Sequence, residues 1–177
     1  KALLEIGRLV GSEESLEMLL SLEENQMVFK TPHFEVATRL LEGAFPDYQK
    51  IIPTTFTTKV EAELSELREA LKVVSVFARD QNSVVKVVVN SEKGFLSFSA
   101  VAAEMGENET TVEATVEATG ETVTEVAFNA RYLSEALGSF SGEMIEFRVS
   151  GSLAPGVFVT PGQDDFLHLI MPIRIQS

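Results

Sequence analysis

One apolar stretch near the end of the sequence decides how we expect the chain to fold: Phe166-Leu167-His168-Leu169-Ile170-Met171-Pro172-Ile173-Arg174-Ile175. Every second side chain from Leu167 to Ile175 is apolar, which is the pattern of a half-buried strand. Pro172 lacks a backbone N–H, which suits an edge strand or a strand about to leave its sheet. Only two residues follow, so an apolar tail ends near the surface. The stretch is either a last strand that packs on the core or a strand that also lines a binding site.

Outward from this stretch, the apolar periodicity predicts short strands and a few helices, typical of an α+β protein. The longest predicted helix carries Leu64, Leu67 and Leu71 at helical spacing. Residues 43–53 contain glycine and two prolines and are predicted to be a linker. The predicted helices span residues 1–11, 61–79 and 129–137, and the predicted strands span residues 16–20, 27–30, 34–41, 57–60, 84–90, 95–102, 110–118, 123–128, 144–149, 156–159 and 166–173.

An internal repeat relates the two ends of the chain. The segment Val28-Phe29-x-Thr31-Pro32 recurs about 129 positions later as Val157-Phe158-x-Thr160-Pro161. At the same offset, apolar residues of the preceding strand and helix also match. The repeated unit is a helix followed by three antiparallel strands, and the long helix with its strands supplies a third copy. An odd number of units predicts that one domain is present only in half.

Composition limits the classes of function. The 177 residues are 45% hydrophobic and 23% charged, as in ordinary globular proteins, and the chain contains no cysteine. We therefore expect no disulfide and no thiolate metal site, in keeping with a reducing cytoplasm. No apolar run approaches membrane-spanning length. The net charge of −13 argues against nucleic acid only weakly, because a local basic stripe can still bind phosphate. Lys1 enters a helical pattern directly, so we expect a piece of a longer chain.

Signals of enzymatic chemistry are poor. His33 and His168 have no spacing suited to a metal or to a nucleophile partner, and no glycine loop of the phosphate-binding kind occurs. The glutamates from Glu104 to Glu125 form an acidic tract without an intervening lysine or arginine, but they lack compact cation-binding spacing. We therefore expect no catalytic residue, no metal and no cofactor. An esterase-like or nuclease-like enzyme is the least favoured alternative.

Three motifs, in the same order and spacing, resemble the bacterial sliding clamp, the beta subunit of DNA polymerase III. They are Leu40-Leu41-Glu42-Gly43-x-Phe45-Pro46-Asp47-Tyr48-x-x-Ile51-Ile52-Pro53, then Phe128-Asn129-x-Arg131-Tyr132-Leu133, then the stretch from His168 to Ile175. The similarity covers the whole chain but only the C-terminal half of a family member. It implies that residues 1–56 are the second half of the middle clamp domain plus the linker, and that residues 57–177 are the complete C-terminal domain.

The resemblance implies the DNA clamp fold, with sheets outside and helices on the inner face. Family members form a homodimeric ring around duplex DNA, as a cytoplasmic, non-catalytic subunit of the DNA-directed DNA polymerase holoenzyme, a nucleotidyltransferase complex. The ring acts as a processivity factor in DNA replication, and the polymerase III alpha subunit, the clamp loader and other proteins dock short glutamine- and leucine- or phenylalanine-containing peptides in its groove. The main alternative is a stand-alone peptide-binding adaptor that reuses the clamp fold without encircling DNA.

Family positions carry over to three sets of residues in this sequence. The peptide-binding groove is expected at Pro46, Lys50, Ile51, Asn82, Asn129, Tyr132, Leu153, Pro155, Leu169, Ile170, Met171, Pro172, Ile173, Arg174 and Ile175. The DNA-facing residues are expected to be Lys1, Arg68, Lys72 and Arg131, and the subunit interface is expected at Val76, Phe77, Glu107, Glu109 and Glu113. The other wall of the groove and the first domain are missing from this sequence, and the tail runs two residues past the usual aliphatic end.

Overall fold

The computed structural model describes residues 2–11, 15–45, 47–78, 83–102 and 106–174. Its contacts divide the chain into two compact units, residues 1–46 and residues 47–177, which we describe separately.

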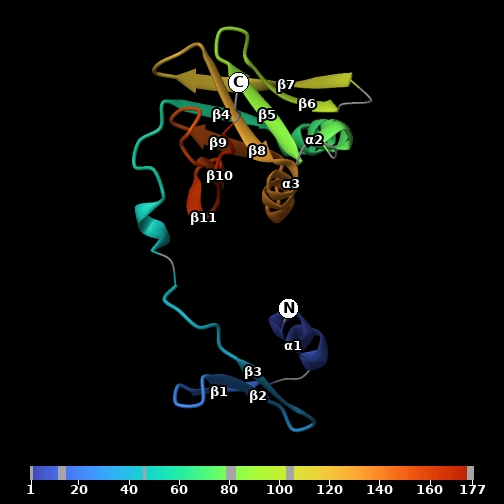
Figure 1. The fold of residues 1–177 in the computed structure, drawn as a ribbon, viewed down its shortest axis with the longest axis vertical. Coiled ribbons are helices and arrows are strands. Elements are labelled where there is room, and N and C mark those ends of the chain that lie inside the picture. The colour runs from blue at the N-terminus through green and yellow to red at the C-terminus, as the bar shows by residue number, and fades with distance from the viewer. Residues whose placement is uncertain (1, 12–14, 46, 79–82, 103–105, 175–177) are drawn as a thin grey trace. The chain divides into compact units, whose positions relative to one another are not determined.

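The first unit is one helix followed by a three-stranded antiparallel meander (Figure 1). Helix α1 spans Ala2–Val10, and strands β1, β2 and β3 span Glu17–Ser21, Gln26–Lys30 and Glu35–Arg39. Ile6 of α1 and Phe29 of β2 are its buried apolar side chains among the described residues. The strand pairs run in order along the chain, β1 with β2 and β2 with β3, as tight turns between antiparallel strands require.

The second unit contains an eight-stranded antiparallel sheet and two α-helices. After a 3₁₀ turn at Tyr48–Lys50, its elements are β4 (Thr58–Glu63), α2 (Leu64–Ala78), β5 (Val84–Asn90), β6 (Phe95–Ala102), β7 (Gly106–Ala118), β8 (Val123–Asn129), α3 (Ala130–Ser139), β9 (Met144–Val149), β10 (Gly156–Thr160) and β11 (Gln163–Ile170). The strand order is β11-β10-β9-β4-β7-β6-β5-β8, so β8 and β11 are the two end strands.

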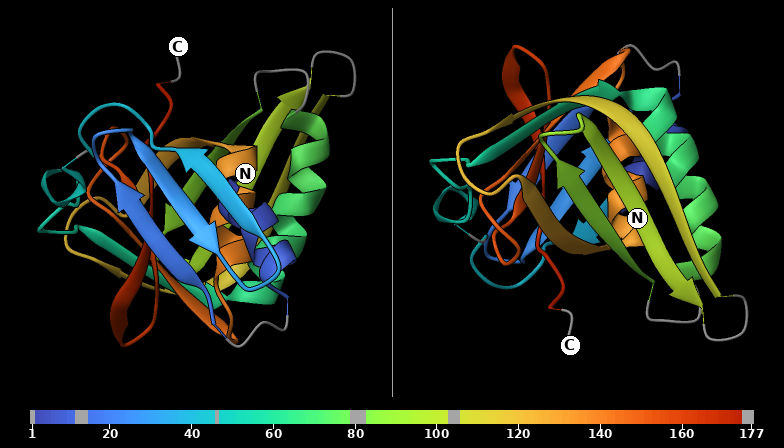
Figure 2. Two further views of the ribbon diagram at one scale, coloured as in Figure 1. Left: turned by 90° about the horizontal axis from the view of Figure 1, so that it is seen from below. Right: turned by 90° about the horizontal axis from the view of Figure 1, so that it is seen from above.

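The sheet curls around α2 and α3, which lie side by side (Figure 2). Alternation explains this arrangement in β5, where Val85, Val87 and Val89 are buried while the residues between them are half-exposed. Helix α2 presents Leu67 and Val74 to the same core at helical spacing. The helices therefore cover one face of the sheet and leave the other face outward.

The repeat predicted from the sequence is confirmed. Each of the three helices is followed by three strands that pair as an antiparallel meander: α1 with β1–β3, α2 with β5–β7, and α3 with β9–β11. Within the second unit the repeat extends to the strand before each helix. Strand β4 pairs with β9, and the equivalent strand β8 pairs with β5.

The predicted start of the long helix was wrong. Residues 58–63 form strand β4, in which Thr58, Val60 and Ala62 are buried, and the helix begins only at Leu64. Strand β4 is paired on both sides, with β7 and with β9. Because this pairing satisfies the backbone groups of the segment on both edges, it overrides the helical preference of its Glu and Ala residues.

The last strand also differs from its prediction, because it spans Gln163–Ile170 rather than residues 166–173. Its buried apolar side chain is Ile170, at 4% exposed, whereas Leu167 and Leu169 on the other face are only half-buried. Burial does not alternate along this strand, and the residue that belongs to the core is Ile170, on the face opposite the predicted one. The strand ends before Pro172, as a residue without a backbone N–H favours.

Candidate peptide-binding surface and cationic helix face

The tail after β11 is held on both sides of Met171. The side chain of Ile170 belongs to the core, and two residues beyond Met171 the Ile173 N–H donates to the Ala127 carbonyl oxygen of β8 over 2.8 Å. Met171 itself is 58% exposed. The tail therefore joins the two end strands of the sheet and presents the Met171 side chain to the outside.

Three predicted groove residues come together beside this hydrogen bond. Leu153, Ile173 and Arg174 line one pocket of about 320 Å³, although they belong to two separate parts of the sequence. The remaining lining residues are Glu125, Val126, Ala127 and Ser152. Leu153 is 59% exposed in the turn between β9 and β10, so an apolar side chain stands at the rim of the pocket.

Asn129 and Tyr132 lie at the start of α3, directly after β8. The Asn129 side-chain oxygen accepts a hydrogen bond from the Arg131 N–H over 2.9 Å, which caps the helix. This cap fixes the first turn of α3, from which Tyr132 projects with 57% of its surface exposed. A large exposed ring on a capped helix is a suitable anchor for a partner.

Lys50 and Ile51 lie in the turn that opens the second unit. The Lys50 ammonium pairs with the Asp47 carboxylate at 2.8 Å, and the Ile51 N–H donates to the Tyr48 carbonyl oxygen over 3.0 Å. Both long side chains remain exposed at the surface. The turn thus adds one apolar side chain and one paired cation to the predicted set.

The rest of the predicted groove set is divided. Pro155, Leu169 and Pro172 are half-buried, whereas the side chain of Ile170 is packed inside the core. Ile170 can contribute to a surface site only through its backbone. The other predicted site residues, Pro46, Asn82 and Ile175 in the groove and Lys1 at the DNA face, lie outside the described residues.

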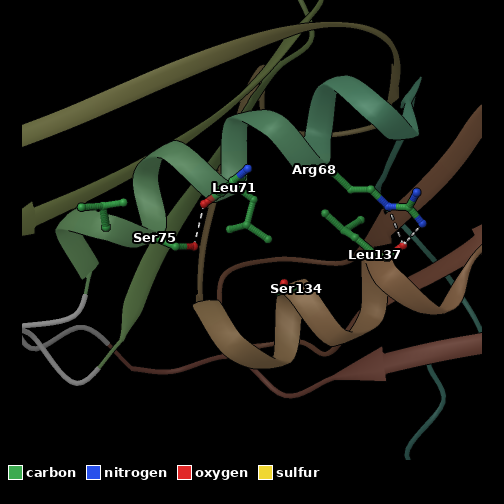
Figure 3. A pocket seen from close by; sticks show the side chains of 7 residues that line it. Arg68, Leu71, Ser75, Ser134 and Leu137 are labelled. Carbon is green, nitrogen blue, oxygen red and sulfur yellow. Dashed lines mark hydrogen bonds between the residues drawn. The ribbon is translucent and has the colours of Figure 1, made fainter.

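Arg68 has a partner within the protein, as Figure 3 shows. Its guanidinium on α2 donates to the Leu137 carbonyl oxygen through Nε at 3.2 Å and through Nη2 at 2.7 Å, and to the Phe140 carbonyl oxygen at 2.9 Å. These carbonyls belong to the end of α3, which carries partial negative charge and lacks intrahelical donors. Arg68 therefore caps α3 from a neighbouring helix and ties the two helices together.

Lys72 lines a pocket of about 320 Å³ between α2 and α3, one turn beyond Arg68. Neither carboxylate nor histidine is among the described residues that line this pocket; the others are Arg68, Leu71, Ser75, Val76, Ser134 and Leu137. The Ser75 hydroxyl is engaged, since it donates to the Leu71 carbonyl oxygen over 2.6 Å. Lys72 is exposed and forms no ion pair with the residues that the structure describes.

Arg131 on the exposed side of α3 pairs with Glu135 one turn later, at 2.9 Å. The hydrogen bond to this carboxylate, together with charge attraction, raises the pKa of Arg131 above its usual range. The pair is fully solvated, so it contributes little to stability, and its charge is locally balanced.

The predicted interface residues fall on two elements. On α2, Val76 is 45% exposed while Phe77 packs partly against the core. On β7, Glu107, Glu109 and Glu113 are exposed on the face opposite the buried Val112. Glu109 accepts a hydrogen bond from the Ser97 hydroxyl over 2.8 Å. These glutamates form one acidic row along the strand.

Sequence reasoning missed the β8 side of the pocket, namely Glu125, Val126 and Ala127. Their role depends on β8 being an end strand beside the tail, and no local pattern reveals a pairing partner so distant along the chain. Within the described residues, no group of three or more His, Cys, Asp or Glu side chains is placed to hold a metal ion. A search of the described helices finds none with the length and apolarity needed to cross a membrane.

Residues 49–174 match the sequence family of the DNA polymerase III beta subunit, C-terminal domain. The beta sliding clamp of Synechococcus elongatus is 29% identical over 180 residues, an alignment that covers 100% of this chain and 47% of the relative. The crystal structure of the DNA polymerase III subunit beta from Pseudomonas aeruginosa superposes with a TM-score of 0.85 at 25% identity, covering 97% of this chain and 46% of that one. The crystal structure of a sliding clamp from Bartonella birtlesii bound to griselimycin superposes with a TM-score of 0.83 at 27% identity. This alignment covers 98% of this chain and 45% of that one.

The chain thus spans slightly less than half the length of the relatives it matches. The family match includes the sheet from β4 to β11, both helices of the second unit and most of the tail. The fold comparison extends the likeness to the first unit, since it covers nearly the whole chain. The chain belongs to the DNA polymerase III beta subunit family, with the sliding clamp fold.

Proposed function

We propose that this chain is part of a sliding clamp that encircles duplex DNA, holds the replication machinery on its template and docks partner peptides on the second unit. The observation that carries the proposal is the family match over residues 49–174. The proposed protein is not an enzyme itself: it serves the DNA polymerase III holoenzyme in the cytoplasm. Residues 1–56 would then be half of a middle domain with its linker, and residues 57–177 would be the C-terminal domain.

The contact-based boundary lies earlier, after residue 46, and the reason is local packing. The Ser150 hydroxyl donates to the Thr55 carbonyl oxygen over 2.6 Å. The guanidinium of Arg148 also lies over the Phe56 ring. The second part of the proposed linker is therefore fastened to the C-terminal domain.

The peptide site of this proposal is the surface formed by Tyr132, Leu153, Met171 and Ile173, together with the turn at Ile51. The fold leaves four large apolar side chains of this surface 44–59% exposed, namely those of Ile51, Tyr132, Leu153 and Met171. Exposed apolar groups held by fixed backbone suit the anchors of a short peptide, which bind best in preformed, dewetted pockets. The proposed partners are the polymerase III alpha subunit, the clamp loader and other proteins that carry a glutamine- and leucine- or phenylalanine-containing motif.

The proposed DNA contacts lie on α2 and α3 and are sequence-independent. Lys72 supports this assignment, because it is an exposed cation without a carboxylate in its pocket on a chain of net charge −13. A solvated lysine attracts phosphate through charge and released counterions, which holds DNA while still allowing it to slide. Arg68 contributes indirectly, since it fixes the packing of the two helices.

The proposed ring is a homodimer in the full-length protein, with the C-terminal domain meeting the first domain of the neighbouring subunit. Val76 would supply an apolar contact there, and the row Glu107, Glu109 and Glu113 would face basic residues. A long exposed row of like charge repels itself in isolation, so a basic partner surface would stabilise it.

Fluorescence anisotropy of a labelled polymerase-type peptide, titrated with this chain, tests the peptide site. We expect saturable binding, and we expect Met171→Ala and Tyr132→Ala each to weaken it by about 1–3 kcal/mol, as truncated anchors do. Met144→Ala is the matched control, because Met144 is 42% exposed at the start of β9, away from the tail. Equal affinity in all four proteins would contradict the assignment.

Retention on DNA separates the clamp from a peptide-binding adaptor. A closed ring made of the full-length protein should stay on circular DNA and leave linear DNA through its free ends. An adaptor that does not encircle DNA would behave in the same way with circular and with linear DNA. Binding of peptide without any retention on circles would favour the adaptor.

A further inference from the structure

The sulfur chemistry of this chain resides entirely in its methionines, of which there are five, since the sequence has no cysteine. Among the described methionines, Met18, Met144 and Met171 are exposed by 64%, 42% and 58%. Of these three, Met171 is the one that belongs to the proposed peptide site. An exposed thioether is accessible to oxidants, so its chemistry can reach that site.

The position of Met171 keeps its sulfur outside the core. Ile170 occupies the inward position of the strand, and successive side chains of an extended segment point to opposite sides. Pro172 fixes its own backbone φ, and the Ile173 N–H is bonded to β8. The backbone around Met171 therefore cannot rotate to bury the thioether without breaking this hydrogen bond or withdrawing Ile170 from the core.

We propose that Met171 is an oxidation site through which peroxide weakens peptide docking; the inference rests on the proposed function of the same surface. In the reaction one peroxide oxygen is transferred to the thioether Sδ, the O–O bond breaks and water leaves. The sulfur is oxidised to the sulfoxide and the peroxide is reduced. The product is reversible by methionine sulfoxide reductases, so the site can be restored.

Oxidation should lower the affinity for the peptide because the sulfoxide is more polar than the thioether of Met171. A thioether is an apolar, adaptable anchor that packs well against aliphatic and aromatic groups of a peptide. A sulfoxide oxygen buried by the same peptide would lose its water without gaining a donor, which is unfavourable. We expect the dissociation constant to rise about tenfold, comparable to loss of one buried anchor.

The experiment compares this chain with its Met171→Leu and Met144→Leu variants before and after hydrogen peroxide, which is quenched with catalase. The probe is a fluorescein-labelled, glutamine- and leucine/phenylalanine-containing peptide without methionine or cysteine, added after quenching. Mass spectrometry of a digest measures sulfoxide at each methionine, and methionine sulfoxide reductase is then added to the oxidised samples.

We expect peroxide to oxidise Met171 and to weaken binding about tenfold in the parent and in Met144→Leu, but not in Met171→Leu. The reductase should restore the peptide affinity of the oxidised parent protein. Unchanged affinity with Met171 sulfoxide present would overturn the inference. An equal loss of affinity in Met171→Leu would also overturn it, as would an unmodified Met171 in a sample whose Met18 and Met144 are oxidised. If the untreated parent does not bind the peptide, the proposed peptide site itself is refuted, and the inference with it.

Discussion

Replacing Gly156 with alanine should destabilise the second unit, because the added methyl has no room. A Cβ at this position would lie 2.6 Å from Phe128 Cζ, 2.8 Å from Phe147 Cε2 and 3.2 Å from Phe128 Cε1. Carbon atoms pack best at about 3.5–4.0 Å, so the rings would have to move by several tenths of an ångström or more. Gly156 is also paired with Ile170, so the strain would fall on the strand that precedes the tail.

Neither ring can move away easily. Phe128 and Phe147 are 0% and 1% exposed, and Phe147 is stacked on Phe158 with ring centroids 4.8 Å apart. Overpacking a filled core usually costs about 1–3 kcal/mol, and the two contacts below 3 Å place Gly156→Ala toward the upper end of this range. The backbone of β10 would have to shift to relieve the clash.

Urea unfolding followed by tyrosine fluorescence measures this effect in the right unit. Both tyrosines, Tyr48 and Tyr132, belong to the second unit, and the chain has no tryptophan. With a slope of about 2 kcal/mol per molar urea, a loss of about 2–3 kcal/mol should lower the midpoint by about 1–1.5 M. Gly138→Ala is the control: nothing lies within 4 Å of its added Cβ in helix α3, so it should stabilise by about 0.5–1 kcal/mol.

A Gly156→Ala midpoint equal to that of the parent would refute the packing argument. A second test uses the double variant Gly156→Ala with Phe128→Leu, in which the smaller side chain makes space. Its loss of stability should be less than the sum of the two single losses, since the two substitutions share one clash.

Three other outcomes follow from particular contacts. Arg68→Ala should lower the free energy of unfolding by about 1–3 kcal/mol, as measured by urea unfolding. Arg68→Lys should lose less stability than Arg68→Ala but remain less stable than the parent, because an ammonium lacks the guanidinium fork. Lys72→Ala in the full-length protein should reduce the salt slope of retention on circular DNA by about 1 for each subunit of the ring, leaving stability unchanged. The buried hydroxyls of Thr58 and Thr124 lie 3.1 Å apart, so Thr124→Val should cost about 1–3 kcal/mol in the same assay, whereas valine at both positions should be nearly neutral.

The sequence predicted several strands to within one residue of their limits, including β5, β6, β8 and β9. Strand β5 shows why most clearly, because its alternating apolar side chains reflect burial on one side, whereas β6 is buried on both faces. The internal repeat could also be recognised in the sequence, since the equivalent turns at Thr31 and Thr160 carry the same Thr-Pro dipeptide. These signals are local, and they need no knowledge of pairing partners.

The sequence could not predict features that depend on distant neighbours. The strand predicted at residues 57–60 continues through Glu63, where a helix was predicted, because β7 and β9, both remote in sequence, pair with both edges of β4. Arg68 looked like a free cation on a helix face, but its partners are carbonyl groups about 70 positions away, which carry no side-chain signature. The site residues on β8 were missed for the same reason.

The tail explains why large apolar side chains can remain at the surface of this unit without weakening its fold. Ile170 and the Ile173 N–H attach the tail to opposite ends of one sheet, to the core beneath β11 and to the edge of β8. This attachment covers part of an edge strand that would otherwise offer unpaired backbone groups to other chains. Because the backbone is fixed on both sides, the exposure of Met171 is imposed by packing elsewhere. Residues that close the sheet and residues offered to a partner are therefore neighbours in one segment. A substitution at Ile170 should disturb both stability and binding, whereas one at Met171 should disturb binding alone.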